Sequence, residues 1–159
     1  MTRTKPLYLL LLVLLGGGVA WFLENALAAS GRAVLIPPFT IGVALVAIAV
    51  IVIVMALPVR RVARRVPGAR VDPFYATRVV TLAKASSLSG ALLGGAALAI
   101  LGYLATRSVV PALASVSMAL TMTVGASVLF VAGLVAEHMC ALPPEDDERS
   151  TAPQTKDIP

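Results

Sequence analysis

The chain has 159 residues, of which 58% are hydrophobic and only 13% charged. A soluble domain of this size carries about a quarter charged residues, so a water-exposed fold is excluded. The formal net charge of +5 comes mostly from basic residues that flank apolar segments, which favours membrane phosphates over nucleic acid as the counter-charge.

The first apolar segment follows Arg3 and Lys5 and runs from Leu7 to Leu23. Continued to Ala29, it is long enough to cross a bilayer of about 30 Å. A basic start, a leucine-rich run and Ala26-Leu27-Ala28 also fit a cleavable signal peptide with a small-residue site. Because the apolar run is long for a signal peptide, we expect a retained helix over residues 7–29.

Prolines bound the second segment, and a capping signal opens the third. An unbroken apolar run over 39–57 must be helical in lipid to satisfy its backbone. Asp72-Pro73 suits an N-cap and a first helical position, and predicts a third helix over 73–104. At roughly 48 Å that helix exceeds the hydrocarbon thickness, so its first two turns are expected among the lipid headgroups.

The fourth helix is expected over 111–140, with Glu137, His138 and Cys140 marking its exit from lipid. Residues 143–159 are acidic and then rich in Ser, Thr and Pro, which predicts a disordered tail. The predicted fold class is therefore all-α: an integral membrane four-helix bundle over residues 1–142, with a short cytoplasmic amphipathic segment and that tail.

Basic residues are distributed unevenly between the two sides of this domain. Placing both termini, the 58–78 region and Lys84 on one side leaves only Arg32 and Arg107, of 13 Lys and Arg residues, on the other. The positive-inside rule makes the crowded side cytoplasmic. We therefore expect a multi-pass protein of the cell (inner) membrane with cytoplasmic termini.

Small residues line faces of the third and fourth helices at helical spacing. Small side chains let helix backbones approach closely in lipid, as in the GxxxG spacing of Gly90 and Gly94. Helix packing without a ligand is the simplest interpretation. The predicted packing residues are Gly90, Gly94, Gly95, Gly125 and Gly133.

Lys84 lies about one and a half turns inside the apolar boundary of the third helix, where an ammonium costs roughly 2.5–3.5 kcal/mol unless it pairs or snorkels. Glu137 is the first candidate partner and Asp72 the second, while snorkelling to lipid phosphate is the alternative. A polar cluster, functional or structural, is predicted here: Arg70, Asp72, Arg78, Lys84 and Glu137.

Four arginines follow the second apolar segment at helical spacing, with valines between them: Arg60, Arg61, Arg64 and Arg65. We expect a short amphipathic helix on the cytoplasmic leaflet, each arginine gaining about 1 kcal/mol from anionic lipid headgroups. A docking patch for a phosphorylated ligand or an acidic partner is the functional alternative.

Motifs for catalysis or cofactor binding fail in their context. Gly90 to Gly95 has the spacing of a phosphate loop, but Ala96 replaces the lysine and no strand precedes it. The single cysteine and single histidine exclude an intramolecular disulfide and a Cys/His zinc cluster. No catalytic, metal or cofactor residue is predicted, and we expect that the protein is not an enzyme.

The chain resembles an actinobacterial family of small membrane proteins classed as a domain of unknown function, from residue 2 to about 147. The resemblance rests on Thr4-Lys5-Pro6, Arg70-Val71-Asp72-Pro73-Phe74, Arg78, Leu82-Ala83-Lys84-Ala85, Ser87, Gly90, and the exit Glu137, Cys140 and Pro143-Pro144. It implies a four-helix inner-membrane protein without an assigned activity, often encoded near folate-biosynthesis genes. His138-Met139 departs from the aromatic and basic pattern expected there.

Three functions follow as expectations. The first is a non-enzymatic packing, assembly or interaction protein that associates with itself or with another membrane protein through the third and fourth helices. The alternative is a small oligomeric transporter of an anionic solute, because Lys84 is the only ionisable group inside the apolar segments. The third is a membrane enzyme whose reaction the residue spacing does not specify.

Overall fold

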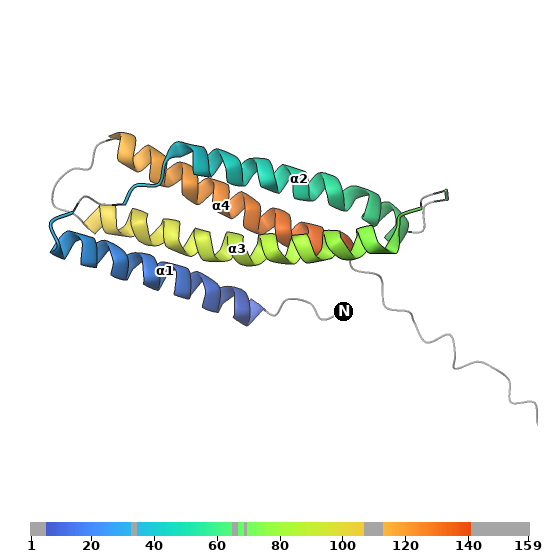
Figure 1. Ribbon diagram of the computed structural model, residues 1–159, viewed down its shortest axis with the longest axis horizontal. Helices are drawn as coiled ribbons and strands as arrows, with labels where there is room; N and C mark the ends of the chain where they lie inside the picture. Colours follow the sequence, from blue (N-terminus) through green and yellow to red (C-terminus); the bar gives the residue numbers. More distant parts are fainter. Residues whose placement is uncertain (1–5, 33–34, 65–66, 69, 107–112, 141–159) are drawn as a thin grey trace, which may run out of the picture.

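The computed structural model describes residues 6–32, 35–64, 67–68, 70–106 and 113–140. They form four α-helices (Figure 1): α1 (Pro6–Ala29), α2 (Phe39–Ala63), α3 (Pro73–Thr106) and α4 (Leu113–Cys140). Each helix is long and apolar enough to cross a membrane, with a mean hydropathy between 1.8 and 3.0 over its most apolar stretch. The predicted all-α, four-helix membrane fold is confirmed.

The observed helix bounds differ most from prediction at the end of α2. Pro58 was expected to end this helix, yet α2 continues to Ala63 with Pro58 inside it. An internal proline costs a helix about 3 kcal/mol because it lacks an N–H and crowds the preceding turn. The helix continues because the next residue, Val59, is buried in a cluster with residues of α3 and α4.

This extension changes the predicted amphipathic segment. Residues 58–63 form the last turns of α2 instead of a separate helix, and Arg64 follows them at the helix end. Arg65, the predicted helical residues 111–112 and the predicted tail over 143–159 lie outside the described residues.

Local hydrogen bonds set one end of α1 and one end of α3. Beyond α1, Gly31 adopts a φ of 71°, and Arg32 N–H donates to the Leu27 carbonyl at 3.0 Å. This is a Schellman motif, which glycine favours because it tolerates a positive φ. At the start of α3, the Phe74 N–H donates to Asp72 Oδ1 at 2.9 Å, so Asp72 caps the helix.

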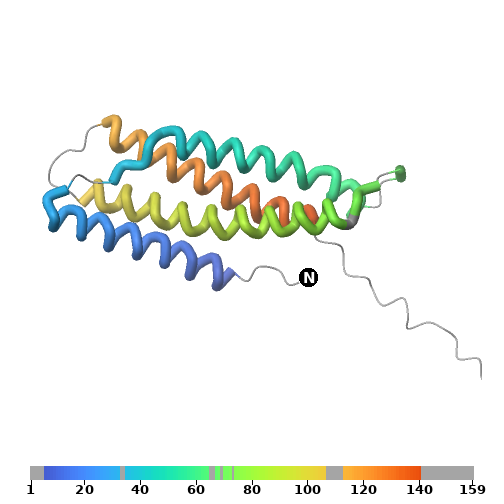
Figure 2. Tube along the Cα trace, viewed as in Figure 1, coloured from blue at the N-terminus to red at the C-terminus, as the bar shows by residue number. Residues whose placement is uncertain are grey.

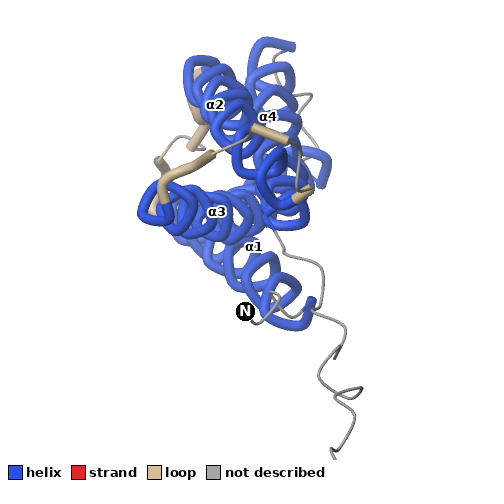
Figure 3. The backbone as a smooth tube through the Cα atoms, turned by 90° about the vertical axis from the view of Figure 1, so that its right-hand side faces the viewer, coloured by secondary structure: helices blue, strands red, loops and turns tan. Residues whose placement is uncertain are grey.

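α3 lies at the centre of the fold. Viewed end-on, α2 and α4 lie on one side of α3 and α1 on the other (Figure 3). Among the described helices, α1 packs against α3 alone, whereas α4 packs against both α2 and α3. Figure 2 shows α1 and α3 running in the same direction. Although α1 and α2 are consecutive in the chain, they do not pack against each other.

Glycines bring helix backbones together at each of three crossings. A Cβ on the glycine would collide with the facing helix in these pairs: Gly16 with Leu92 (α1 and α3), Gly42 with Thr121 (α2 and α4), and Gly133 with Ser87 (α3 and α4). The hydrophobic effect does not drive helices together in lipid, so close van der Waals contact is a main source of helix packing energy. Glycine therefore sets the spacing of all three pairs.

The buried core lies between α2, α3 and α4 and is rich in alanine and valine, such as Ala49, Val52 and Ala126, with a few larger residues such as Leu129. Many large apolar side chains lie on the outside instead, including Leu14, which is 63% exposed, and Phe22, which is 77% exposed. Water-facing monomers rarely carry apolar surface of this extent. Lipid is the solvent that this surface fits.

Candidate functional site

Two helices enclose a buried hydrogen bond near one end of the fold. The end of the fold where α2 and α4 finish and α3 begins is called the arginine-rich end. It carries five arginines: Arg60, Arg61, Arg64, Arg70 and Arg78. Ser87 of α3 is fully buried, and its hydroxyl donates to Glu137 Oε1 of α4 at 2.8 Å. Gly133, one turn before Glu137, makes room for it, because a Cβ there would lie 2.5 Å from the Ser87 backbone nitrogen.

Lys84 occupies the turn of α3 immediately before Ser87 and is half-buried. Its carbonyl oxygen lies 2.9 Å from the Ser87 hydroxyl. Lys84 and Glu137 therefore share one level of the α3–α4 interface, although the ion pair between them stays a prediction. Asp72 lies roughly 18 Å further along the α3 axis, beyond the direct reach of Lys84.

The start of α1 indicates the depth of Lys84. Counting ten residues back from the contact of Gly16 with Leu92, along two helices that run in the same direction, brings Pro6 level with Leu82. Lys84 is then level with the first turn of α1. A lysine at that depth extends easily to the headgroup layer.

The other members of the predicted polar cluster lie apart from this contact. Asp72 is exposed and caps α3, Arg70 is exposed before the helix, and Arg78 is exposed on its second turn. The predicted cluster thus divides into two groups. One is Glu137 with Lys84 nearby, and the other is a surface group around the start of α3.

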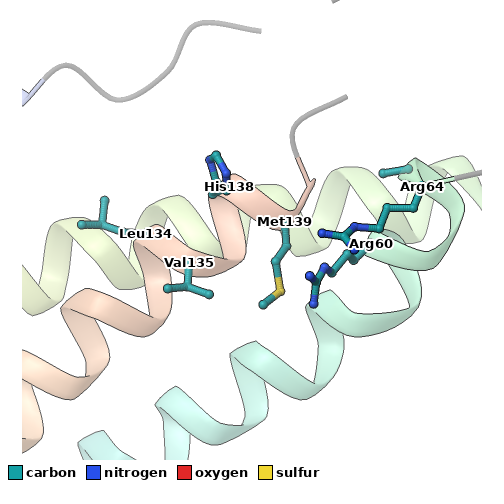
Figure 4. Close-up of a pocket in the computed structure, with 7 residues that line it drawn as sticks. Arg60, Arg64, Leu134, Val135, His138 and Met139 are labelled. Carbon is teal, nitrogen blue, oxygen red and sulfur yellow. The ribbon is translucent and has the colours of Figure 1, made fainter. Parts of the chain in front are cut away.

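A groove of about 440 Å³ lies between the last turns of α2 and α4 (Figure 4). Its lining includes Arg60 and Arg64 of α2 and, from α4, Leu134, Val135, His138 and Met139. Figure 4 shows both arginine side chains reaching toward Met139, while the His138 ring points away from them. Arg61 is exposed and does not line the groove. Of the predicted row of arginines, Arg60 and Arg64 therefore line the groove, whereas Arg61 does not.

The five glycines predicted for helix packing face other helices of the same chain. Their nearest neighbours across an interface are as follows: Gly90 meets Phe130, Gly94 meets Ala126, Gly95 meets Val13, Gly125 meets Gly42 and Gly133 meets Ser87. Four of these contacts involve backbone atoms of the facing residue, whereas a Cβ on Gly94 would lie 3.9 Å from the Ala126 Cβ, an ordinary contact. These five glycines therefore pack the helices of one chain against each other.

Glu24 of α1 is a buried carboxylate outside the predicted polar cluster. It is 2% exposed, and its Oε2 accepts the Leu35 backbone N–H of the α1–α2 linker at 3.4 Å. One turn earlier, Trp21 contacts Tyr103 of α3 edge-on, with ring centroids 5.8 Å apart. Glu24 follows Gly17 by seven residues, which places both on the face of α1 that meets α3. That spacing was the available signal.

Four long apolar helices, with polar contacts toward both ends of the fold, define a multi-pass, all-helical membrane protein. A family model described as "Protein of unknown function (DUF3180)" matches residues 9–144, and the chain belongs to this family. No curated protein and no solved structure matches the chain. The family match agrees with the resemblance to membrane proteins of unknown function.

Proposed function

We propose that this protein is a non-enzymatic interaction protein of the cell membrane that acts by packing against a second copy of itself through α1. α1 supports this proposal because, among the described helices, it packs against α3 alone. Its remaining surface carries large apolar side chains such as Leu14, Val19 and Phe22, all more than 60% exposed. No charged residue lies between Leu7 and Leu23, so charge does not select a different partner.

A second copy is the partner that this surface favours. Assemblies of identical chains related by a two-fold axis are by far the commonest oligomers, and an uncharged face meets its own copy without repulsion. The glycines of α3 and α4 do not support an interface with a second copy, because they face helices of the same chain. The proposed interface is therefore on α1 and not, as the sequence predicted, on α3 and α4.

Transport and catalysis have less support from the geometry. Between Ser87 and Tyr103, a distance of roughly 24 Å along α3, the described helices carry buried small residues, among them Gly90, Ala97 and Ala126. Transport of a charged solute usually needs an ionisable group near the bilayer midplane. The described acidic and basic side chains lie toward the two ends of the fold instead, which favours function at the surfaces of the protein.

The same proposal includes both termini in the cytoplasm and α1 retained in the mature chain. The positive-inside rule supports the orientation, since the arginine-rich end gathers most basic residues of the described helices and loops. Packing of Gly16 and Gly17 against α3, together with burial of Glu24, supports α1 as part of the folded domain.

Photo-crosslinking in native membranes tests the proposed interface. A photoreactive phenylalanine analogue replaces Phe22 of α1 in one sample and Phe74 of α3 in the control; both side chains are 77% exposed. We expect a discrete adduct of twice the chain mass from position 22 and none from position 74. Mass measurement in a mild detergent should give the same dimer.

A strictly monomeric mass, combined with lipid adducts alone at position 22, would overturn the proposal. Equal dimer adducts from both positions would indicate random collision in the membrane, and would equally count against α1 as the interface. A photoreactive group at Val54 of α2, which is 57% exposed, provides a lipid-facing reference.

A further inference from the structure

We propose that the groove between α2 and α4 binds one anionic phospholipid, with the lipid phosphate held by Arg60 and Arg64. This inference is independent of the α1 interface, because the groove lies on other helices at the arginine-rich end. The sequence predicted that four arginines contact lipid headgroups, whereas the groove assigns one lipid to two of them.

Charge makes the groove suitable for a phosphate. Arg60 lies on the last turn of α2 and Arg64 directly follows the helix, and the described lining contains no Asp or Glu. The C-terminal ends of α2 and α4 each contribute roughly half a negative elementary charge, so two guanidinium groups leave the groove positive. Guanidinium groups bind phosphate oxygens through paired N–H donors, with a geometry that lysine lacks.

The opposite wall makes the groove suitable for a lipid in particular. Leu134, Val135 and Met139 of α4 are half-buried and give it an apolar wall. One turn further toward the membrane interior, Leu57 on α2 is 42% exposed and Val131 on α4 is 55% exposed. Apolar surface thus continues from the phosphate position along both helices, as an acyl chain requires and a free phosphate does not.

The depth of the two arginines fits the headgroup layer. The apolar run of α2, residues 39–57, spans about 28 Å, close to the roughly 30 Å hydrocarbon core of a bilayer. Arg60 and Arg64 follow this run by one to two turns. A phosphate at the membrane surface therefore lies level with their guanidinium groups.

Native mass spectrometry of the full chain in a mild detergent tests the proposal. Phosphatidylglycerol and phosphatidylcholine with identical acyl chains are offered to the wild type, to Arg60→Gln/Arg64→Gln, and to the control Arg61→Gln/Arg78→Gln. The control loses the same charge from two exposed arginines outside the groove. We expect the groove variant to lose roughly 25-fold in phosphatidylglycerol binding, about fivefold per arginine, and the control to lose less than twofold.

Two further measurements identify the source of the phosphate. Val135→Trp fills the groove without changing its charge and should abolish phosphatidylglycerol binding, and excess inorganic phosphate should not displace the lipid. Equal losses in the two arginine variants, or equal binding of phosphatidylcholine by the wild type, would overturn the proposal. Displacement by inorganic phosphate would also overturn it, in favour of a free-anion site. If Val135→Trp does not fold, the comparison of the two arginine variants is sufficient to test the proposal.

Discussion

The hydroxyl of Ser87 has one proton and two acceptors, the Glu137 carboxylate at 2.8 Å and the Lys84 carbonyl at 2.9 Å. A hydroxyl donates only one hydrogen bond at a time, so these two acceptors compete for the same proton. The bond ties α4 to α3 at the turn that follows Lys84. Glu137 therefore lies where an opposite charge on residue 84 would act on it directly.

A charge exchange tests whether Lys84 and Glu137 also form an ion pair. Lys84→Glu and Glu137→Lys should each lower the free energy of unfolding by about 1–3 kcal/mol, because each leaves like charges at one level of the interface. The double variant should recover at least half of that loss. Unfolding in mixed micelles provides the measurement.

The control for this exchange is Arg78→Glu combined with Glu137→Lys. Arg78 is exposed and lies six residues before Lys84, so this combination should recover nothing. If Lys84→Glu with Glu137→Lys folds no better than either single variant, the two residues do not form a pair.

At the scale of the helices, α1 depends on one interface. A Cβ on Gly16 would collide with the Leu92 backbone of α3, whereas a Cβ on Gly18 would have no atom within 4 Å. Neighbouring glycines of one run therefore differ completely in their surroundings. Gly16 supports the attachment of α1, whereas Gly18 does not.

Gly16→Ala should loosen α1, and Gly18→Ala should not. We expect Gly16→Ala to cost about 1–3 kcal/mol, as for other overpacked interfaces, and Gly18→Ala to stay within about 0.5 kcal/mol of the wild type. Hydrogen exchange in detergent should then be faster in α1 of the first variant and unchanged in α2, which does not contact α1. Faster exchange throughout the chain would instead indicate global destabilisation.

The number and extent of the helices could be predicted from the sequence because apolar runs and capping signals are local. The end of α2 could not, because the burial of Val59 against other helices outweighs the cost of Pro58. At the candidate site, the antiparallel order of the last two helices was enough to bring Lys84 and Glu137 to one level. The contact with Ser87 and the α2–α4 groove depend on the helix register, which uniformly apolar sequences do not reveal.

At the scale of the whole molecule, the charged ends imply one orientation in the membrane. The described turn at Pro67-Gly68 belongs to the arginine-rich end, whereas Gly31 and Arg32 follow α1 at the opposite end. A positive-inside orientation places the first in the cytoplasm and the second outside it.

Reporter fusions test this orientation. Phosphatase, which is active outside the cytoplasm, should be inactive when inserted at Gly68 and active at Gly31, and a cytoplasmic fluorescent reporter should show the reverse pattern. The physical reason is the cost of translocating several arginines. Phosphatase activity at Gly68 would contradict the orientation.

The central position of α3 has a consequence for biogenesis. The first two helices to emerge from the ribosome do not pack against each other. The partner of α1 is α3, and the main partner of α2 is α4, so both partners are synthesised later. Both therefore stay solitary in the bilayer until the second half of the chain has been inserted. A nascent chain stalled before Pro73 would hold two unassembled spans, so productive assembly of this protein is a late, post-insertion event.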